Sequence, residues 1–498
     1  MPPNSARNCL TENGANGGPL NPADKGIDNL PSDRIMEPCQ QHQKGVATIM
    51  VLISAVFLIV TSPVSADSKH GAKSAILVKT QSENPNVTEG LDIICHERSV
   101  TVRAGACRVG GKTVNVKETA LTVDPAESVA VDDEWHAITD QRPRQWQGGT
   151  RLLAGRKPYR VMPGQLAPNS LSIHADAEQT GARYQRDKDY YLDEFWGALC
   201  RLPPGRIKPK QRVAISYVYG LRRVDRIEVT PEGKVVLRRG RPKVDCPPMP
   251  PKTRGSVTLA TVYRPYHARD VQAHHVYVVN EAKAAETPKP DIEPVAKTLA
   301  KLRAGQPVTI VCWGDSVTVG GDASRPEHRY VDLFGTRLRK RFPNSKIKVI
   351  NAGIGGTSTP GRLPAYAKEV LAHKPDLITV EFVNDMGLPI ERLRANWRNA
   401  IAQARKIGAD FVIITPHYVM PSWMGKKYAR GPETRANCNA LRKLASDEKV
   451  GLADAARRWE ILEYAGVPYE ILLMNGINHP DDRGHALFVD ELMRLFPK

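Results

Sequence analysis

Four short segments of the sequence hold side chains of the types that acyl transfer requires. They are Gly314-Asp315-Ser316, the glycine-rich stretch 351–357, Val383-Asn384-Asp385 and Asn478-His479-Pro480. Acyl transfer needs a nucleophile, a base that takes its proton, and hydrogen-bond donors aimed at the developing oxyanion. Serine, histidine, a glycine N–H and an asparagine amide can fill these roles. The four segments therefore predict a serine-based acyl-transfer site.

The first three segments each follow an apolar, β-branched run of residues. These runs lie at 307–313, 347–350 and 377–382, and a further one lies at 411–414. Between the runs, apolar residues recur at helical spacing. This alternation predicts an α/β fold of three layers, in which a parallel sheet has helices on both faces. Sites in such folds collect at the carboxyl ends of the strands, so the segments should meet at one edge of the sheet.

The order of the four segments resembles the SGNH, or GDSL-type, hydrolase superfamily, over about residues 305–498. The resemblance implies that Ser316 is the nucleophile and that His479 is the general base. It also implies an oxyanion hole made by the backbone N–H groups of Ser316 and Gly356 and by the side-chain amide of Asn384. It implies no metal and no cofactor.

The acid that would orient the histidine is missing from its usual place. In the superfamily an aspartate stands three residues before the histidine, and here that position is Gly476. The nearest polar candidates are Asn475 on one side of His479 and Asp481 and Asp482 on the other. Either aspartate could instead cap the last helix. The identity of the orienting acid therefore stays open, and a serine–histidine dyad without such an acid is the alternative.

Other residues near the four segments also have two interpretations. His417 and Trp423 lie in a loop after an apolar run, where they either line a substrate pocket or pack internally. His485 fits a helix face better than a second base. The superfamily usually reads Gly-x-Asn-Asp at the third segment, but here Phe382 and Val383 precede Asn384. The loss of that glycine restricts the backbone at this point, although the asparagine remains.

Residues 67–285 have a different character from the segment that follows. The stretches 226–230 and 234–238 alternate between apolar and polar residues and are joined by Pro231-Glu232-Gly233, which is a hairpin signature. Long helical periodicity is scarce. We predict a β-rich accessory domain, either an antiparallel β-sandwich or a pair of small β modules. A linker at 286–304 would join it to a hydrolase-type domain at 305–498.

The N-terminal segment, residues 1–66, contains the features of an export signal. Residues 46–60 form one uncharged apolar run, and Val64 and Ala66 satisfy the small-residue rule for cleavage. The run is shorter than the roughly 20 residues that span a bilayer. We therefore expect a cleaved signal peptide, with an uncleaved anchor as the alternative. Met36 is an alternative start that would give a signal of ordinary length.

Export would place the chain in an oxidising compartment. Six cysteines follow the signal, and in such a compartment disulfides can form and persist. There Cys95, Cys107, Cys200 and Cys246 could form one or two bridges within one domain, with the pairing left open. No pair has C-x-x-C spacing, so neither a zinc site nor a thioredoxin-type centre is indicated.

Composition excludes several functional classes. The 498 residues are 41% hydrophobic and 25% charged, which are globular values rather than those of a disordered or polytopic membrane protein. Aromatic residues make up 6%, which argues against a nucleic-acid platform of stacked rings. The net charge of +18 is spread over both large segments. An excess of basic residues that is spread in this way favours weak attraction to a polyanion or a cell surface through the β domain. The alternative is a solvated basic surface with no specific partner.

These observations lead to one expected function and two alternatives. We expect an exported serine ester hydrolase that removes short acyl groups, such as acetyl, from carbohydrate through an acyl-Ser316 intermediate. A lipid or phospholipid esterase is the alternative within the same class. A surface-binding protein with a degenerate, non-catalytic hydrolase domain is the alternative from a different class.

The signal-peptide interpretation predicts a mature chain that begins at or near Asp67. N-terminal sequencing of secreted or periplasmic protein measures this directly. A chain that still starts before residue 46 and is extracted only by detergent would instead identify an anchor.

Overall fold

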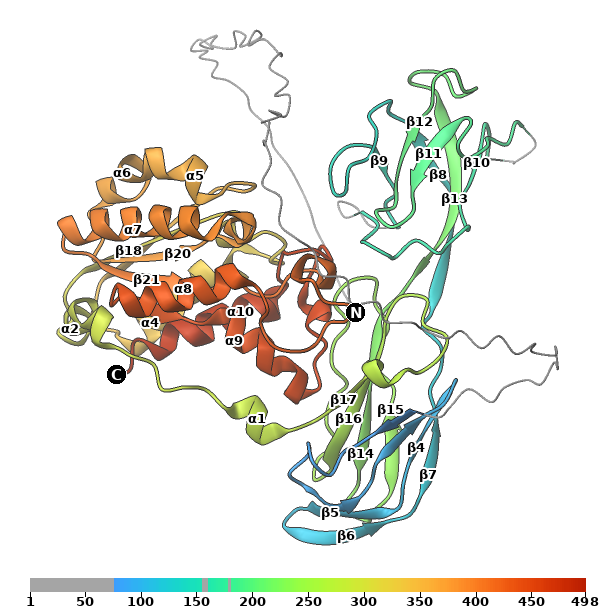
Figure 1. The fold of residues 1–498 in the computed structure, drawn as a ribbon, viewed down its shortest axis with the longest axis horizontal. Helices are drawn as coiled ribbons and strands as arrows, with labels where there is room; N and C mark the ends of the chain where they lie inside the picture. Colours follow the sequence, from blue (N-terminus) through green and yellow to red (C-terminus); the bar gives the residue numbers. More distant parts are fainter. Residues whose placement is uncertain (1–75, 155–159, 178–180) are drawn as a thin grey trace, which may run out of the picture. The chain divides into compact units, whose positions relative to one another are not determined.

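The computed structural model describes residues 76–154, 160–177 and 181–498, and the apolar run at 46–60 lies outside them. The C-terminal domain is built on a five-stranded parallel sheet with the strand order β19-β18-β20-β21-β22 (Figure 1). The strands are β18 (Val308–Gly314), β19 (Ile347–Gly353), β20 (Leu377–Glu381), β21 (Asp410–Ile414) and β22 (Gly451–Ala453). The predicted α/β fold is therefore confirmed.

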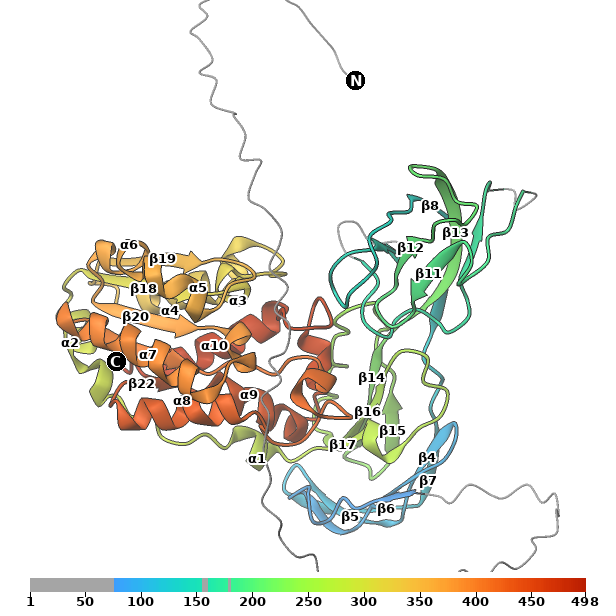
Figure 2. The same ribbon diagram turned by 45° about the horizontal axis from the view of Figure 1, so that its top comes forward.

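Both faces of this sheet are buried, which is why its strands are apolar without alternation. In β18, Ile310 and Cys312 belong to one hydrophobic core, whereas Val311 and Trp313 belong to the other. The first core includes α4 (Tyr330–Arg341) and α10 (Asp482–Arg494), and the second includes α7 (Ile390–Lys406) and α8 (Ala436–Asp447). The shorter helices are α2 (Ala296–Arg303), α3 (Ser316–Val319), α5 (Thr359–Arg362), α6 (Tyr366–Glu369) and α9 (Ala455–Glu460), several of which are labelled in Figure 2.

The preceding segment is composed of antiparallel sheets, as predicted. The first group of strands comprises β1 (Ile76–Val78), β2 (Val87–Gly90), β3 (Ile93–Cys95), β4 (Ser99–Val102), β5 (Gly105–Val109), β6 (Lys112–Val116) and β7 (Thr119–Thr122). The second comprises β8 (Ser128–Ala137), β9 (Thr150–Arg151), β10 (Ser172–His174), β11 (Tyr190–Asp193), β12 (Ala198–Arg201) and β13 (Arg212–Gly220). The third comprises β14 (Arg223–Val229), β15 (Val235–Arg238), β16 (Val257–Arg264) and β17 (Val276–Val278), and a short helix, α1 (Glu281–Ala285), follows it.

These strands enclose two separate hydrophobic cores. The first and third groups share one core, and the second group surrounds another. Two cores correspond to a pair of small β modules rather than to a single sandwich. The predicted hairpin is present: β14 pairs antiparallel with β15, and Gly233 in the turn has a φ of 77°.

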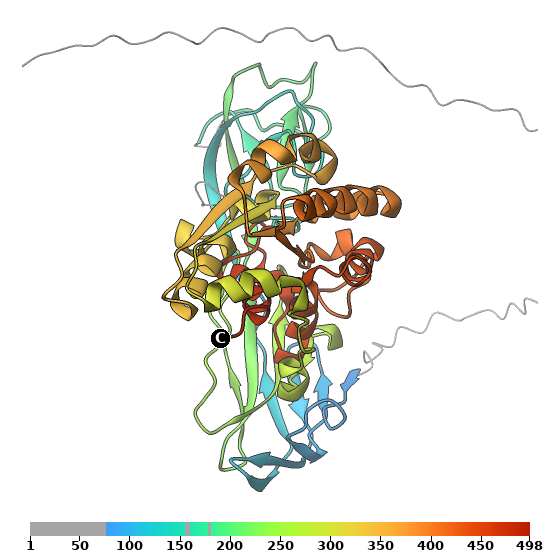
Figure 3. The ribbon, with the colours of Figure 1, turned by 90° about the vertical axis from the view of Figure 1, so that its left-hand side faces the viewer.

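The sheet of the third group is also joined to the C-terminal domain. Its residues Val224, Tyr263 and Tyr277 belong to the same hydrophobic core as α4 and α10. The hydroxyl of Thr261 donates to the carbonyl of Gly466 at 2.5 Å. A Cβ at Gly466 would lie 2.8 Å from the Thr261 methyl group, so the close approach requires glycine. The described residues from 76 to 498 accordingly belong to one compact unit, whose strands and helices are drawn from the side in Figure 3.

The expectation of disulfides among the first four cysteines is wrong in this structure. Cys95, Cys107, Cys200 and Cys246 are all free thiols buried within the protein, as are Cys312 and Cys438. Burial raises the pKa of the Cys95 and Cys107 thiols to about 11. These side chains pack as small apolar residues, which is a common role for a buried cysteine.

Within the described residues, every helix is too short or too polar to cross a membrane.

Candidate active site

The chain turns sharply at the carboxyl end of β18 to present Ser316. A Cβ at Gly314 would lie 2.0 Å from the Thr318 hydroxyl and 2.2 Å from the Glu381 carbonyl, so only glycine fits between these neighbours. The Asp315 carboxylate accepts the Val317 N–H at 3.0 Å and thereby caps α3. Ser316, the first residue of this one-turn helix, is half-buried at the edge of the sheet.

His479 lies within hydrogen-bonding distance of the serine. Its Nε2 is 2.9 Å from the Ser316 Oγ, and its Nδ1 is 2.9 Å from Oδ2 of Asp322. A carboxylate at Nδ1 holds the imidazole in the tautomer whose Nε2 accepts a proton, and it stabilises the imidazolium formed during attack. Ser316, His479 and Asp322 therefore have the geometry of a nucleophile, a general base and its orienting acid.

The turn after α3 brings Asp322 to the histidine. α3 ends at Gly320, whose φ of 90° is in the left-handed region that favours glycine. A Cβ at Gly321 would lie 2.9 Å from two ring atoms of His479. Asp322 itself has a φ of 63°, a conformation that aspartate tolerates better than most residues. Two glycines followed by an aspartate thus let the chain fold back around the imidazole.

The predicted oxyanion-hole residues lie at the ends of the neighbouring strands. Asn384 follows β20, and its backbone N–H donates to Asp315 at 3.0 Å. Its side-chain amide donates to the Thr357 carbonyl at 2.9 Å, in the turn that also contains Gly356. Gly356 has a φ of 71°, and a Cβ at the adjacent Gly355 would lie 3.7 Å from the Ser316 Cβ. The structure therefore brings the asparagine and this glycine turn beside the serine, as the sequence predicted.

Asp315 joins the two halves of this arrangement. Its two carboxylate oxygens accept the N–H of Val317, which follows the serine, and the N–H of Asn384. Burial raises the pKa of Asp315 to about 6, although these two hydrogen bonds favour the ionised form. Asp315 therefore positions the serine and the asparagine relative to each other.

Residues 312–487 match the model of the GDSL-like Lipase/Acylhydrolase family. This match confirms the predicted SGNH/GDSL-type resemblance of the C-terminal domain. An acetylxylan esterase of Geobacillus stearothermophilus is 23% identical over 141 residues, a match that covers 24% of this chain and 63% of the relative. The chain thus matches less than two thirds of that relative's length.

Among solved structures, a two-domain esterase active on acetylated mannans has a TM-score of 0.35 and 19% identity, covering 42% of this chain and 53% of that one. The acetylxylan esterase Axe2 from Geobacillus stearothermophilus has a TM-score of 0.33 and 18% identity, covering 38% of this chain and 94% of that one.

The acid of this GDSL-type domain is not one of the three residues that the sequence suggested. The Asn475 side-chain oxygen accepts the backbone N–H groups of Ile477, Asn478 and His479 at 2.9–3.0 Å, so it shapes the histidine loop. Asp481 caps α10 through the Gly484 N–H. Asp482 contacts Ser324 and His328.

Both expectations about the acid, a C-terminal carboxylate and a dyad, are therefore wrong. The acid instead follows the nucleophile by six residues. The signal that could have revealed it is the Gly320-Gly321-Asp322 turn directly after α3.

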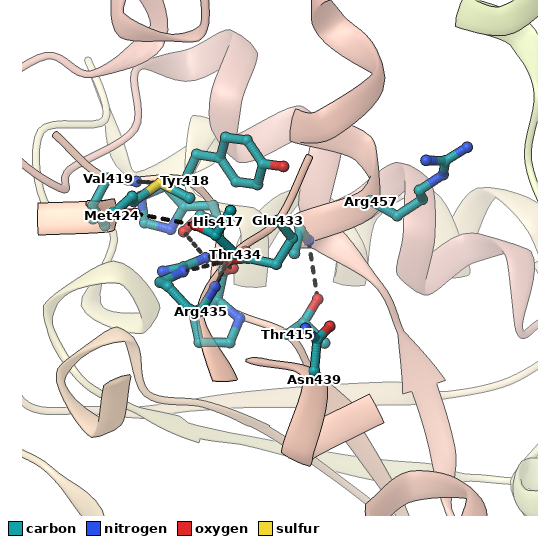
Figure 4. A network of polar contacts seen from close by, with 12 residues as sticks. Thr415, His417, Tyr418, Val419, Met424, Glu433, Thr434, Arg435, Asn439 and Arg457 are labelled. Carbon is teal, nitrogen blue, oxygen red and sulfur yellow. Dashed lines mark hydrogen bonds and ion pairs between the residues drawn. The ribbon is translucent and has the colours of Figure 1, made fainter. Parts of the chain in front are cut away.

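In the loop after β21 of the GDSL-type domain, side chains form a polar network around Arg435 (Figure 4). The Arg435 guanidinium donates to the carbonyls of Pro416 and His417, both at 2.9 Å, and forms an ion pair with Glu433. His417 is fully buried, and its Nε2 lies 2.8 Å from the Asn478 carbonyl. Of the two pocket candidates in this loop, His417 therefore packs internally, whereas Trp423 is 38% exposed.

His485 is a buried residue of α10 and not a second base. It stacks on Tyr330, and its Nε2 lies 3.5 Å from the Gly321 carbonyl. Burial lowers the pKa of His485 to about 4, so the ring is neutral near pH 7. It therefore lies behind the glycine turn that faces His479.

The triad geometry predicts that Asp322→Asn lowers kcat on 4-nitrophenyl acetate by about 10³- to 10⁴-fold, because the amide favours the wrong imidazole tautomer. The melting temperature should change little, since Asp322 lies in a half-buried turn. The matched control is Asp481→Asn, which should keep turnover within about twofold and at most lower stability by about 1 kcal/mol. Full turnover by the Asp322 variant would remove this residue from the triad.

The buried His485 predicts a loss of stability in acid. Between its unfolded pKa near 6.5 and its folded pKa of about 4, only the unfolded state binds the proton, so stability falls as pH falls. Between pH 7 and pH 5, His485 should account for a loss of about 2 kcal/mol in the free energy of unfolding. Urea titrations at both pH values should show that loss reduced in His485→Gln but not in the exposed control His373→Gln. Equal losses in all three proteins would contradict the assignment.

Proposed function

We propose that the protein is an exported serine ester hydrolase that removes short acyl groups, such as acetyl, from carbohydrate. The observation that carries the proposal is the arrangement of Ser316, His479 and Asp322, with 2.9 Å at each of the two hydrogen bonds. The match of residues 312–487 to the model of the GDSL-like Lipase/Acylhydrolase family supports the same reaction class. The acetylxylan esterase relative supports an acetylated carbohydrate as the substrate.

The reaction proceeds in two steps through an acyl-enzyme. His479 Nε2 removes the Ser316 proton as the Oγ attacks the ester carbonyl carbon, and the C–Oγ bond forms. The imidazolium then gives this proton to the alkoxy oxygen, so the ester C–O bond breaks and the alcohol leaves. A water molecule, deprotonated by His479, attacks the acyl carbon, and the proton returns to Ser316 as the acid is released.

The negative charge that develops on the carbonyl oxygen needs preorganised donors. In the proposed mechanism these are the backbone N–H groups of Ser316 and Gly356 and the side-chain amide of Asn384. The Asn384 amide already donates to the Thr357 carbonyl at 2.9 Å, which fixes its orientation with a second N–H left for the substrate. The hydrogen bond from its backbone to Asp315 holds the loop in place.

Export and surface contact are part of the proposal. The apolar run at 46–60, followed by Val64 and Ala66, supports a signal peptide. The excess of basic residues in the β segment supports weak contact with a polyanion or a cell surface.

The mechanism predicts that Ser316→Ala lowers kcat on 4-nitrophenyl acetate by at least about 10⁴-fold without unfolding the protein. A fluorophosphonate probe should label the wild type at Ser316 and leave the variant unlabelled. Equal turnover by the variant would place the nucleophile elsewhere, and a wild type without turnover or labelling would favour a binding protein.

The chain length of the acyl group separates the two candidate substrate classes. A panel of 4-nitrophenyl esters from two to sixteen carbons should give the highest kcat/KM at two to four carbons. A maximum at ten carbons or more would instead identify a lipid esterase.

A further inference from the structure

A cavity of about 220 Å³ lies directly beside the triad and is lined by residues of both halves of the chain. The GDSL-type domain contributes Asp322, Asn475 and Ile477. The second β module contributes Trp146 and Trp196, together with Arg151 and Arg160. Asp322 and Asn475 both hydrogen-bond to His479, so the cavity begins at the residues that orient the base.

Aromatic side chains cluster at this cavity, and three of them, Trp146, Trp423 and Phe195, are exposed. Trp146 is 46% exposed, and its ring centroid lies 5.0 Å from that of Trp423, which is 38% exposed. The ring centroid of Trp196 lies 6.5 Å from that of Trp146. Phe195, also exposed, contacts Trp196 edge-on at 5.5 Å. Exposed aromatic clusters of this size mark binding sites more often than ordinary surface.

One member of the cluster, Trp196, is anchored in a hydrophobic core. Trp196 is buried in a small core with Ala198 of the β module and Met420 of the loop after β21. Within the GDSL-type domain, the Met420 N–H donates to the Ile477 carbonyl at 2.6 Å. Arg151 of β9 also lines the cavity, and its guanidinium donates to the backbone carbonyls of Trp196 and Gln145. These hydrogen bonds hold the segments around Gln145 and Trp196 to β9. A preformed aromatic surface with a few fixed polar groups is typical of a ligand site.

The chemistry of the reaction says which part of the substrate faces this surface. The base that takes the serine proton must later give it to the alkoxy oxygen of the leaving group. The alcohol part of the ester therefore leaves on the His479 side of Ser316. The carbonyl oxygen points the other way, toward Asn384 and the 355–357 turn of the proposed oxyanion hole. The cavity continues from the His479 side, which is where the alcohol must go.

We propose that Trp146 and Trp423 form a sugar-binding surface for the alcohol part of the substrate, so that the second β module supplies part of the active site. The proposal rests on the proposed function, because it takes the alcohol to be a carbohydrate. The apolar C–H face of a pyranose ring packs on an indole, and its hydroxyl groups can reach Asn475 and the two arginines. A glycan of several units would contact both tryptophans, whereas a small ester would reach only the triad.

The kinetic test compares a small and a large substrate on the full chain. The substrates are 4-nitrophenyl acetate and chemically acetylated xylan and glucomannan oligosaccharides of two to six units. Trp146→Ala and Trp423→Ala should each lower kcat/KM on the oligosaccharides by about tenfold more than on 4-nitrophenyl acetate, mainly through KM. The matched control is Trp135→Ala, a tryptophan of β8 that is 40% exposed and outside the cavity. It should leave both values unchanged.

A binding measurement separates substrate contact from a general loss of folding. Ser316→Ala should bind the acetylated oligosaccharides without cleaving them and change its tryptophan fluorescence as it does so. The double variant Ser316→Ala/Trp146→Ala should lose that change while keeping the melting temperature of the single variant. Parallel losses on both substrates, or oligosaccharide binding that survives in both Ser316→Ala/Trp146→Ala and Ser316→Ala/Trp423→Ala, would overturn this inference while leaving the esterase proposal intact. Absence of any activity on 4-nitrophenyl acetate in the wild type would instead overturn the esterase proposal.

Discussion

The two hydrogen bonds of the His479 imidazole are the interaction on which the rest of the site depends. Each ring nitrogen has one partner at 2.9 Å, and both partners, Ser316 and Asp322, come from the short stretch that follows β18. The spacing between nucleophile and acid is therefore set locally, by one helical turn and two glycines. The tertiary fold must then place only one further segment, the loop before α10 that carries His479, against that stretch. The hydrogen bonds of Asn475 to three successive N–H groups of this loop serve that purpose.

Much of the C-terminal domain could be predicted from the sequence because its signals are local and repeated. A strand buried on both faces must be apolar throughout, and a helix on the sheet must show one apolar face. β18 and α7 satisfy these rules, so the sequence pattern predicts where they lie. It also predicts that Ser316 and Asn384 lie at the ends of strands. The β modules were harder, because short antiparallel strands give weak patterns. The sequence consequently left open whether they form one sandwich or two modules, and the two cores decide for two.

The residues that sequence reasoning missed depend on geometry that a pattern does not contain. Asp322 was overlooked because the superfamily pattern directs attention to the positions around His479. Its identification needed the left-handed turn at Gly320 and the contact that forbids a side chain at Gly321. Trp146 was overlooked for a different reason. Nothing in its local sequence indicates that it meets Trp423, which is almost 280 positions away in the chain. The expected disulfides failed because buried thiols and bridged cysteines have the same sequence signature.

The hydrophobic core that Val224, Tyr263 and Tyr277 share with α4 and α10 makes the hydrolase half dependent on its neighbour. If the chain were cut near residue 286, the rings that now fill this boundary would be lost, and the surface they cover would meet water. The shortened protein would be prone to self-association, although every residue of the triad would still be present. The shared core also means that the third sheet and the parallel sheet should unfold together, as one cooperative unit. During evolution, substitutions on one side of this boundary would then be accepted only when the other side could accommodate them.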